Sequence, residues 1–138
     1  MGLTHVTVKV AGLEKGNPFE GEFVVDTGSI DCMAPRASLE AAGVQTKGNA
    51  VYELANGEPI EYEYGYGWLY FMGEETISRI IFGPADCEPL LGVVALESVG
   101  LMVDPITQKL KRLHAKPLKL SRSFVNSLPK YEQTLNRR

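Results

Sequence analysis

The stretch Phe23-Val24-Val25-Asp26-Thr27-Gly28-Ser29 passes without a break from apolar residues to an acid, a hydroxyl residue and a glycine. Consecutive aromatic and β-branched residues are typical of a buried strand. Asp, Thr and Gly then favour a tight loop at the end of that strand. The stretch therefore predicts a carboxylate presented at a strand end, although an ordinary Asx turn would show the same triplet.

Short strands account for most of the chain around this stretch. Val6, Val8 and Val10 alternate with polar residues, and further strands are expected over residues 19–25, 51–54, 60–64, 68–72, 76–82, 101–103 and 109–113. Two short helices are expected over 35–42 and 93–99, each followed by a glycine. We interpret Gly65-Tyr66-Gly67 as a bulge or bend that interrupts a strand. The pattern predicts a mainly β domain, a closed barrel or a sandwich, with one or two short helices.

Length and composition exclude several classes of protein. The 138 residues are 44% hydrophobic and 22% charged, which fits one compact domain. The apolar runs are far shorter than the roughly 20 residues of a membrane-spanning helix, and the start shows no signal segment, so we expect a cytoplasmic protein without a membrane partner. Cys32 and Cys87 show no metal-ligand spacing with His5 and His114, so neither a disulfide scaffold, a metal nor another cofactor is expected.

Charge is distributed unevenly along the chain. Residues 1–104 hold five Lys/Arg against sixteen Asp/Glu, a net charge of −11, whereas residues 105–138 hold nine against one, a net charge of +8. We therefore divide the chain into a domain over 1–114 and a basic C-terminal extension over 115–138. Basic clusters can bind nucleic acid, but this one lacks interleaved aromatic residues. A solvated tail, or one folded over the acidic body, is favoured over a nucleic-acid partner. Five apolar residues near helical spacing also allow a short docking helix: Phe124, Val125, Leu128, Tyr131 and Leu135.

A second motif supports a functional interpretation of Asp26-Thr27-Gly28. Leu90-Leu91-Gly92 lies about sixty residues downstream and is followed by the expected helix over 93–99, and an aromatic-rich hairpin with an Asn-Gly turn lies between the two motifs. In this order and spacing, residues 4–114 resemble the retropepsin-like aspartic proteases, in particular their single-domain bacterial and archaeal members. The resemblance implies a closed β-barrel of the acid protease fold that works as a twofold homodimer.

The resemblance also implies a reaction, the hydrolysis of peptide bonds by an aspartic endopeptidase. Asp26, Thr27 and Gly28 would be the catalytic residues. One carboxylate must activate water while a second carboxylic acid protonates the carbonyl oxygen. Because the chain carries one such triplet, Asp26 from each of two subunits would form the dyad. Ser29 would donate a hydrogen bond to the outer carboxylate oxygen, which favours the ionised dyad and an acidic to mildly acidic optimum.

The resemblance also implies which residues of this chain would line the substrate pocket. Apolar side chains of a peptide substrate would lie against the site, while the hairpin over residues 51–64, here called the flap, would close over the peptide backbone. The residues expected to bind substrate are Ser29, Asp31, Met33, Ala55, Asn56, Gly57 and Leu90. Tyr52 and Trp68 are candidates for an aromatic latch of the flap, and Val93 stands where viral members carry an arginine that braces the dimer. A different class of function stays open: a non-catalytic dimeric peptide-binding module with the same fold.

Overall fold

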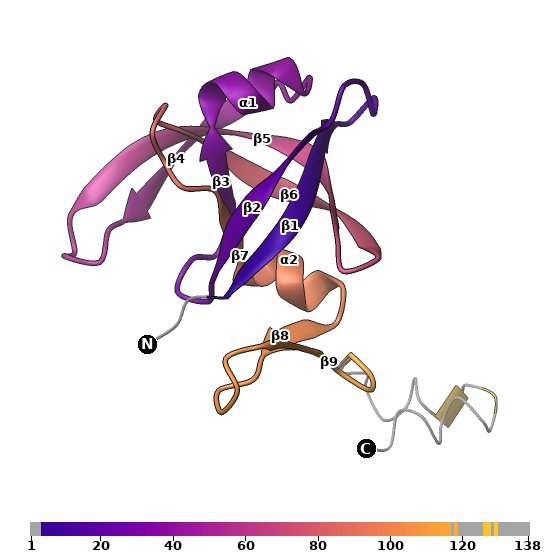
Figure 1. Ribbon diagram of the computed structural model, residues 1–138. Coiled ribbons are helices and arrows are strands. Elements are labelled where there is room, and N and C mark those ends of the chain that lie inside the picture. The colour runs from indigo at the N-terminus through magenta and orange to yellow at the C-terminus, as the bar shows by residue number, and fades with distance from the viewer. Residues whose placement is uncertain (1–3, 117, 119–125, 128, 130–138) are drawn as a thin grey trace.

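The computed structural model describes residues 4–116, 118, 126, 127 and 129, and the fold lies in the first of these ranges (Figure 1). This range contains two short helices, α1 (Arg36–Ala41) and α2 (Val93–Ser98). Its nine strands are β1 (His5–Gly12), β2 (Phe19–Asp26), β3 (Cys32–Pro35), β4 (Thr46–Glu53), β5 (Pro59–Phe71), β6 (Glu74–Gly83), β7 (Leu90–Gly92), β8 (Leu101–Val103) and β9 (Leu110–Arg112).

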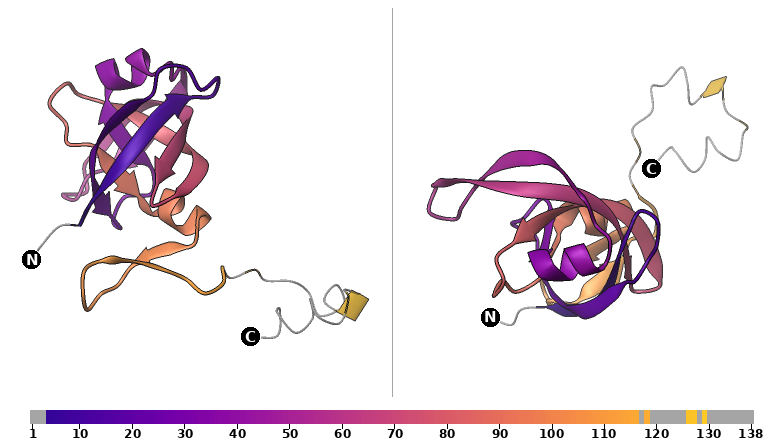
Figure 2. Two further views of the ribbon diagram at one scale, coloured as in Figure 1. Left: turned by 45° about the vertical axis from the view of Figure 1, so that its right-hand side comes forward. Right: turned by 90° about the horizontal axis from the view of Figure 1, so that it is seen from above.

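Six of these strands close into a barrel. Their hydrogen-bonded order is β1-β2-β7-β3-β6-β5, and β5 pairs with β1 to complete the ring. β4 pairs with β5 alone, so the β4–β5 hairpin extends beyond the barrel (Figures 1 and 2). The described part of the chain is therefore a mainly β structure with a closed barrel and two short helices, as the sequence pattern predicts.

The barrel is filled by apolar side chains that alternate along the strands. Val8 and Val10 of β1, Phe23 of β2 and Leu69 of β5 are fully buried, and Leu91 of β7 joins them. Burial of each side chain of this size contributes about 1.5–3 kcal/mol relative to exposure. Because β2 and β7 both contribute fully buried residues, the two motifs picked out in the sequence are fixed to the same core.

The glycines of β5 do not interrupt the strand, and the bulge expected at Gly65-Tyr66-Gly67 lies instead in β4, whose register shift falls opposite Tyr64 and Gly65. β5 runs without interruption through this segment. A Cβ atom on Gly65 would lie 2.2 Å from the carbonyl oxygen of Gln45, and one on Gly67 would lie 2.8 Å from that of Ala11. The glycines therefore permit a neighbouring backbone to approach closely.

Two strands differ from expectation at their ends. β4 begins five residues earlier than expected, at Thr46, and carries a register shift between Thr46 and Gly48. β3 was not expected, because four residues that end in a proline give too short a pattern. It pairs in parallel with β6 and antiparallel with β7, which links the two halves of the barrel.

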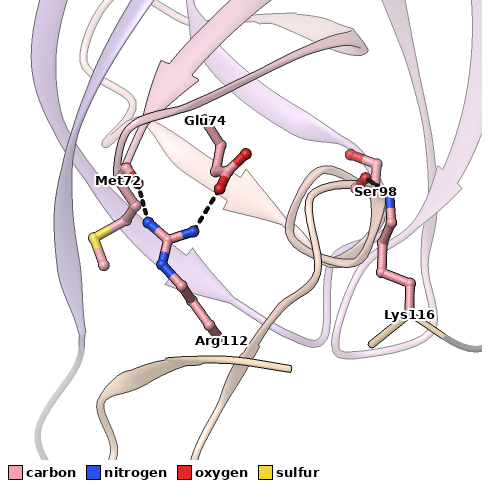
Figure 3. Close-up of polar contacts among 5 residues, drawn as sticks. All are labelled: Met72, Glu74, Ser98, Arg112 and Lys116. Atoms are coloured by element: carbon pink, nitrogen blue, oxygen red, sulfur yellow. Dashed lines mark hydrogen bonds and ion pairs between the residues drawn. The ribbon is translucent and has the colours of Figure 1, made fainter. Parts of the chain in front are cut away.

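The expected C-terminal hairpin is present as β8 and β9, and side-chain contacts tie it to the barrel (Figure 3). Arg112 of β9 pairs with Glu74 of β6 at 2.5 Å and donates to the carbonyl oxygen of Met72. Lys116 donates through Nζ to the carbonyl oxygen of Ser98 in α2, at 3.0 Å. Lys116 lies at the start of the predicted extension over 115–138, so this start contacts α2. The docking helix proposed for the tail lies almost entirely outside the described residues.

Candidate active site

Asp26 is the last residue of β2, at the point where the strand leaves the barrel core. Val24 and Val25 before it are buried, whereas Thr27 and Gly28 after it are exposed. β2 pairs in parallel with β7, and this register places Asp26 opposite Gly92. The two sequence motifs therefore lie side by side, and Asp26 stands half-buried at the edge of the core.

Both carboxylate oxygens of Asp26 accept hydrogen bonds from its own loop. The Gly28 N–H donates to Oδ1 at 2.9 Å, and the Ser29 hydroxyl donates to Oδ2 at 3.1 Å. The expected contact of Ser29 is thus present. A Cβ atom on Gly28 would lie only 3.2 Å from Oδ1, so a glycine suits the position. These donors fix the orientation of the carboxylate.

The start of α2 braces the loop from the other side. The N–H groups of Val93 and Val94 donate to the carbonyl oxygens of Ser29 and Ile30, at 2.8 and 3.3 Å. The first N–H groups of a helix have no partner within the helix. Val93 therefore holds the loop through its backbone N–H group.

Gly92 lets β7 approach this loop. A Cβ atom there would lie 2.6 Å from the carbonyl oxygens of both Ile30 and Asp31. Its N–H donates to Cys32 Sγ at 3.3 Å, and burial raises the pKa of the Cys32 thiol to about 11. Cys32 is therefore a neutral structural thiol beside the site. The sequence does not predict this contact, because Gly92 and Cys32 lie 60 residues apart and neither residue type indicates it.

Apolar residues expected in the pocket form a row beside the loop. Met33 of β3 pairs with Leu90 of β7 and, on its other side, with Ile81 of β6. Met33 and Leu90 are both partly exposed. The barrel thus brings the two expected contact residues together across neighbouring strands, as an apolar surface that a substrate side chain could cover.

The predicted tip residues of the flap form a hydrogen-bonded turn at the end of the β4–β5 hairpin. Leu54 and Glu58 are joined by a backbone hydrogen bond of 2.8 Å, and the Asn56 side chain accepts from the Glu58 N–H at 3.0 Å. Gly57 adopts a φ of +86°, which favours glycine. Ala55, Asn56 and Gly57 are all exposed. No described contact joins this tip to Asp26.

Tyr52, three residues before the tip, contacts the loop instead. Its hydroxyl donates to Asp31 Oδ2 at 2.7 Å. Burial, and next the hydrogen bond to Asp31, raise the pKa of Tyr52 to about 12. Asp31, expected to bind substrate, therefore holds the flap in this structure. Trp68, the other candidate latch, stacks on Tyr70 at 6.2 Å between ring centroids and contacts Lys15.

Comparisons with known proteins leave the chain without an assigned family. No protein-family model matches it, and no curated protein matches it. In the described residues, no three His, Cys, Asp or Glu side chains form a group that could hold a metal ion. Neither α1 nor α2, the helices of that part of the chain, is long and apolar enough to cross a membrane.

Proposed function

We propose that this protein is an aspartic endopeptidase of the retropepsin-like type. The observation that carries the proposal is the state of Asp26: a half-buried carboxylate at a strand end, oriented by Gly28 and Ser29, and set against Gly92 by a parallel strand pair. The apolar pair Met33 and Leu90 beside it supports binding of an extended peptide with apolar side chains.

The second carboxyl would come from a second copy of the chain. Within this chain, the acids nearest to Asp26 in sequence are Glu22 and Asp31, which accept hydrogen bonds from Thr7 and Tyr52, respectively. Ile30 and Val94 are apolar residues next to the loop, joined by a backbone hydrogen bond, and their exposed fractions are 66% and 48%. A twofold axis near Asp26 would cover this apolar surface and bring the two carboxyls together, because an isologous contact presents the same patch twice.

Hydrolysis then needs one ionised and one protonated carboxyl. The ionised Asp26 takes a proton from water as the water oxygen attacks the peptide carbonyl carbon, and the partner's Asp26 gives its proton to the carbonyl oxygen. In the second step the C–N bond breaks, the nitrogen takes a proton from the carboxyl that had gained one, and a hydroxyl proton returns to the other carboxylate. Two products leave, and the dyad again carries one proton.

Cleavage of a mixed peptide library between pH 3 and 8 tests this proposal. The wild type, Asp26→Asn and the matched control Glu20→Gln, which replaces an exposed carboxylate at the other end of β2, would be compared by mass spectrometry. We expect cleavage between apolar residues by the wild type and the control, and none by Asp26→Asn. Peptide binding by a confirmed dimer without turnover at any pH would favour the non-catalytic binding module and refute the proposal.

A further inference from the structure

We propose that Arg79 is a positioning residue of the proposed peptidase: together with Asp31 it holds the Tyr52 hydroxyl and so fixes the flap relative to the Asp26 loop. This inference rests on the proposed function for its effect on catalysis. Its structural part concerns how a two-stranded arm is held to the barrel, and can be measured without turnover.

The flap needs such a contact because it has few others. The pairing of β5 with β6 begins at Tyr64, so residues 59–63 pair with β4 alone. A two-stranded hairpin is marginally stable by itself in water. At its base, Glu63 forms an ion pair with Arg36 of α1. The hydrogen bond from Tyr52 to Asp31 lies farther out, three residues from Ala55 at the tip.

Arg79 and Asp31 lie beside each other on the barrel surface. β3 and β6 are parallel and pair Cys32 with Ile80, so the residues that precede them, Asp31 and Arg79, are neighbours across the two chain segments. Side chains alternate along a strand. Since Cys32 and Ile80 are buried in the core, Asp31 and Arg79 point outward together. The charges of Asp31 and Arg79 act on each other, and both act on Tyr52.

Arg79 is itself held in place by β5. Its guanidinium lies 3.8 Å from the centroid of the Tyr64 ring, and its Nη2 donates to the Tyr66 hydroxyl at 2.9 Å. A stacked and hydrogen-bonded guanidinium is oriented before any partner arrives. The Arg79 charge also acts on Tyr52. The Tyr52 hydroxyl thus donates to the Asp31 carboxylate, and the fixed Arg79 cation acts on both residues.

Loss of this arrangement should affect substrate binding more than chemistry. None of the three side chains contacts Asp26 in the described hydrogen bonds, so their effect on the reaction passes through the flap. A flap that holds the peptide equally in the ground state and the transition state changes KM and leaves kcat unchanged. A hydrogen bond to a charged group is strong enough to change the closed population by about tenfold.

Variants that remove single groups test the proposal. Tyr52→Phe removes only the hydroxyl, Arg79→Met keeps an unbranched side chain but removes the charge, and Tyr62→Phe removes a hydroxyl from the same flap as a control. We expect Tyr52→Phe and Arg79→Met each to raise KM about five- to tenfold with kcat within about twofold. Amide hydrogen exchange over residues 51–62 should rise by a similar factor. Tyr62→Phe should match the wild type.

The double variant separates a positioning role from a general loss of stability. Since Arg79 acts through Tyr52, Tyr52→Phe with Arg79→Met should be no worse than the more affected single variant, whereas independent effects would multiply. Multiplying effects, or exchange rates equal to those of the wild type in both single variants, would overturn the proposal. An inactive wild type would refute the proposed function, and the exchange rates would still decide how the flap is held.

Discussion

Replacing Gly92 with alanine should disable the site while leaving the barrel folded. The added Cβ atom would lie 2.6 Å from the carbonyl oxygens of Ile30 and Asp31, whereas ordinary contacts begin at 3.4 Å. Either β7 or the Asp26 loop must therefore move by about 0.8 Å, the difference between these two distances. Overpacking of this kind costs about 1–3 kcal/mol of unfolding free energy.

The effect on catalysis should be larger than the effect on stability. A misplacement of about 1 Å at a reacting group can lower the rate by about 10²-fold. We therefore expect Gly92→Ala to lose about two orders of magnitude in kcat/KM, whereas its free energy of unfolding, measured with urea, should fall by about 1–3 kcal/mol. Both are measured at a protein concentration above that needed for the proposed dimer.

Gly21→Ala provides the matched control within β2. A Cβ atom at Gly21 would find its nearest neighbours at 3.9 and 4.0 Å, in the rings of Phe19 and Phe23, which is an ordinary contact. This variant should keep wild-type activity and lie within about 1 kcal/mol of wild-type stability. Equal activity and equal stability of Gly92→Ala and Gly21→Ala would refute the close approach between β7 and the loop as the basis of the site.

Four other outcomes are expected. Specific activity should fall on dilution below the dimer dissociation constant, because each proposed site would need Asp26 from two subunits, and constant specific activity in a preparation shown to be monomeric would exclude the shared dyad. A chelator should leave cleavage unchanged, and chelator-sensitive cleavage would exclude the two-carboxyl chemistry. In native protein at pH 8 a thiol reagent should modify Cys87 slowly and Cys32 only on unfolding, since burial raises the pKa of both thiols and Cys32 is fully enclosed; labelling of Cys32 at the faster rate would contradict this. The pKa of Tyr52 rises on folding from 10 to about 12, so the contribution of its hydroxyl to stability is complete below pH 10 and is lost as the pH rises through 12. The difference in unfolding free energy between wild type and Tyr52→Phe should therefore shrink between pH 10 and 12. A difference that does not change with pH would contradict this prediction.

Local pattern was sufficient for the strands that enter the core. Phe23 and Val25 precede the polar triplet in β2, and the alternation of Val8 and Val10 predicts β1, because burial on one face requires that spacing. Gly65 was misinterpreted for the opposite reason. Glycine is disfavoured within strands in general, and the backbone that requires it here belongs to Gln45, a residue that local spacing does not bring near.

In the candidate site, too, contacts within one segment could be predicted from the sequence, whereas contacts between distant segments could not. Asp26 with its donors Gly28 and Ser29 lies within four residues, so the sequence was enough to expect the loop and its hydrogen bond from Ser29. The contact of Tyr52 with Asp31 depends on the curvature of the flap, and the place of Arg79 depends on the pairing of β3 with β6. Such contacts follow from the assembled barrel, and no spacing within one segment indicates them.

The parallel pairing of Asp26 with Gly92 also sets a time at which the site can first exist. The two residues are 66 positions apart, so a growing chain carries the Asp26 loop long before it carries the strand and helix that brace it. Closing so long a loop costs conformational entropy, which is offset only after the contacts between the distant segments have formed. Contacts between residues far apart in sequence form slowly. A nascent chain on the ribosome would therefore display the acidic loop without its brace, and the proposed peptidase would be silent until synthesis has passed α2.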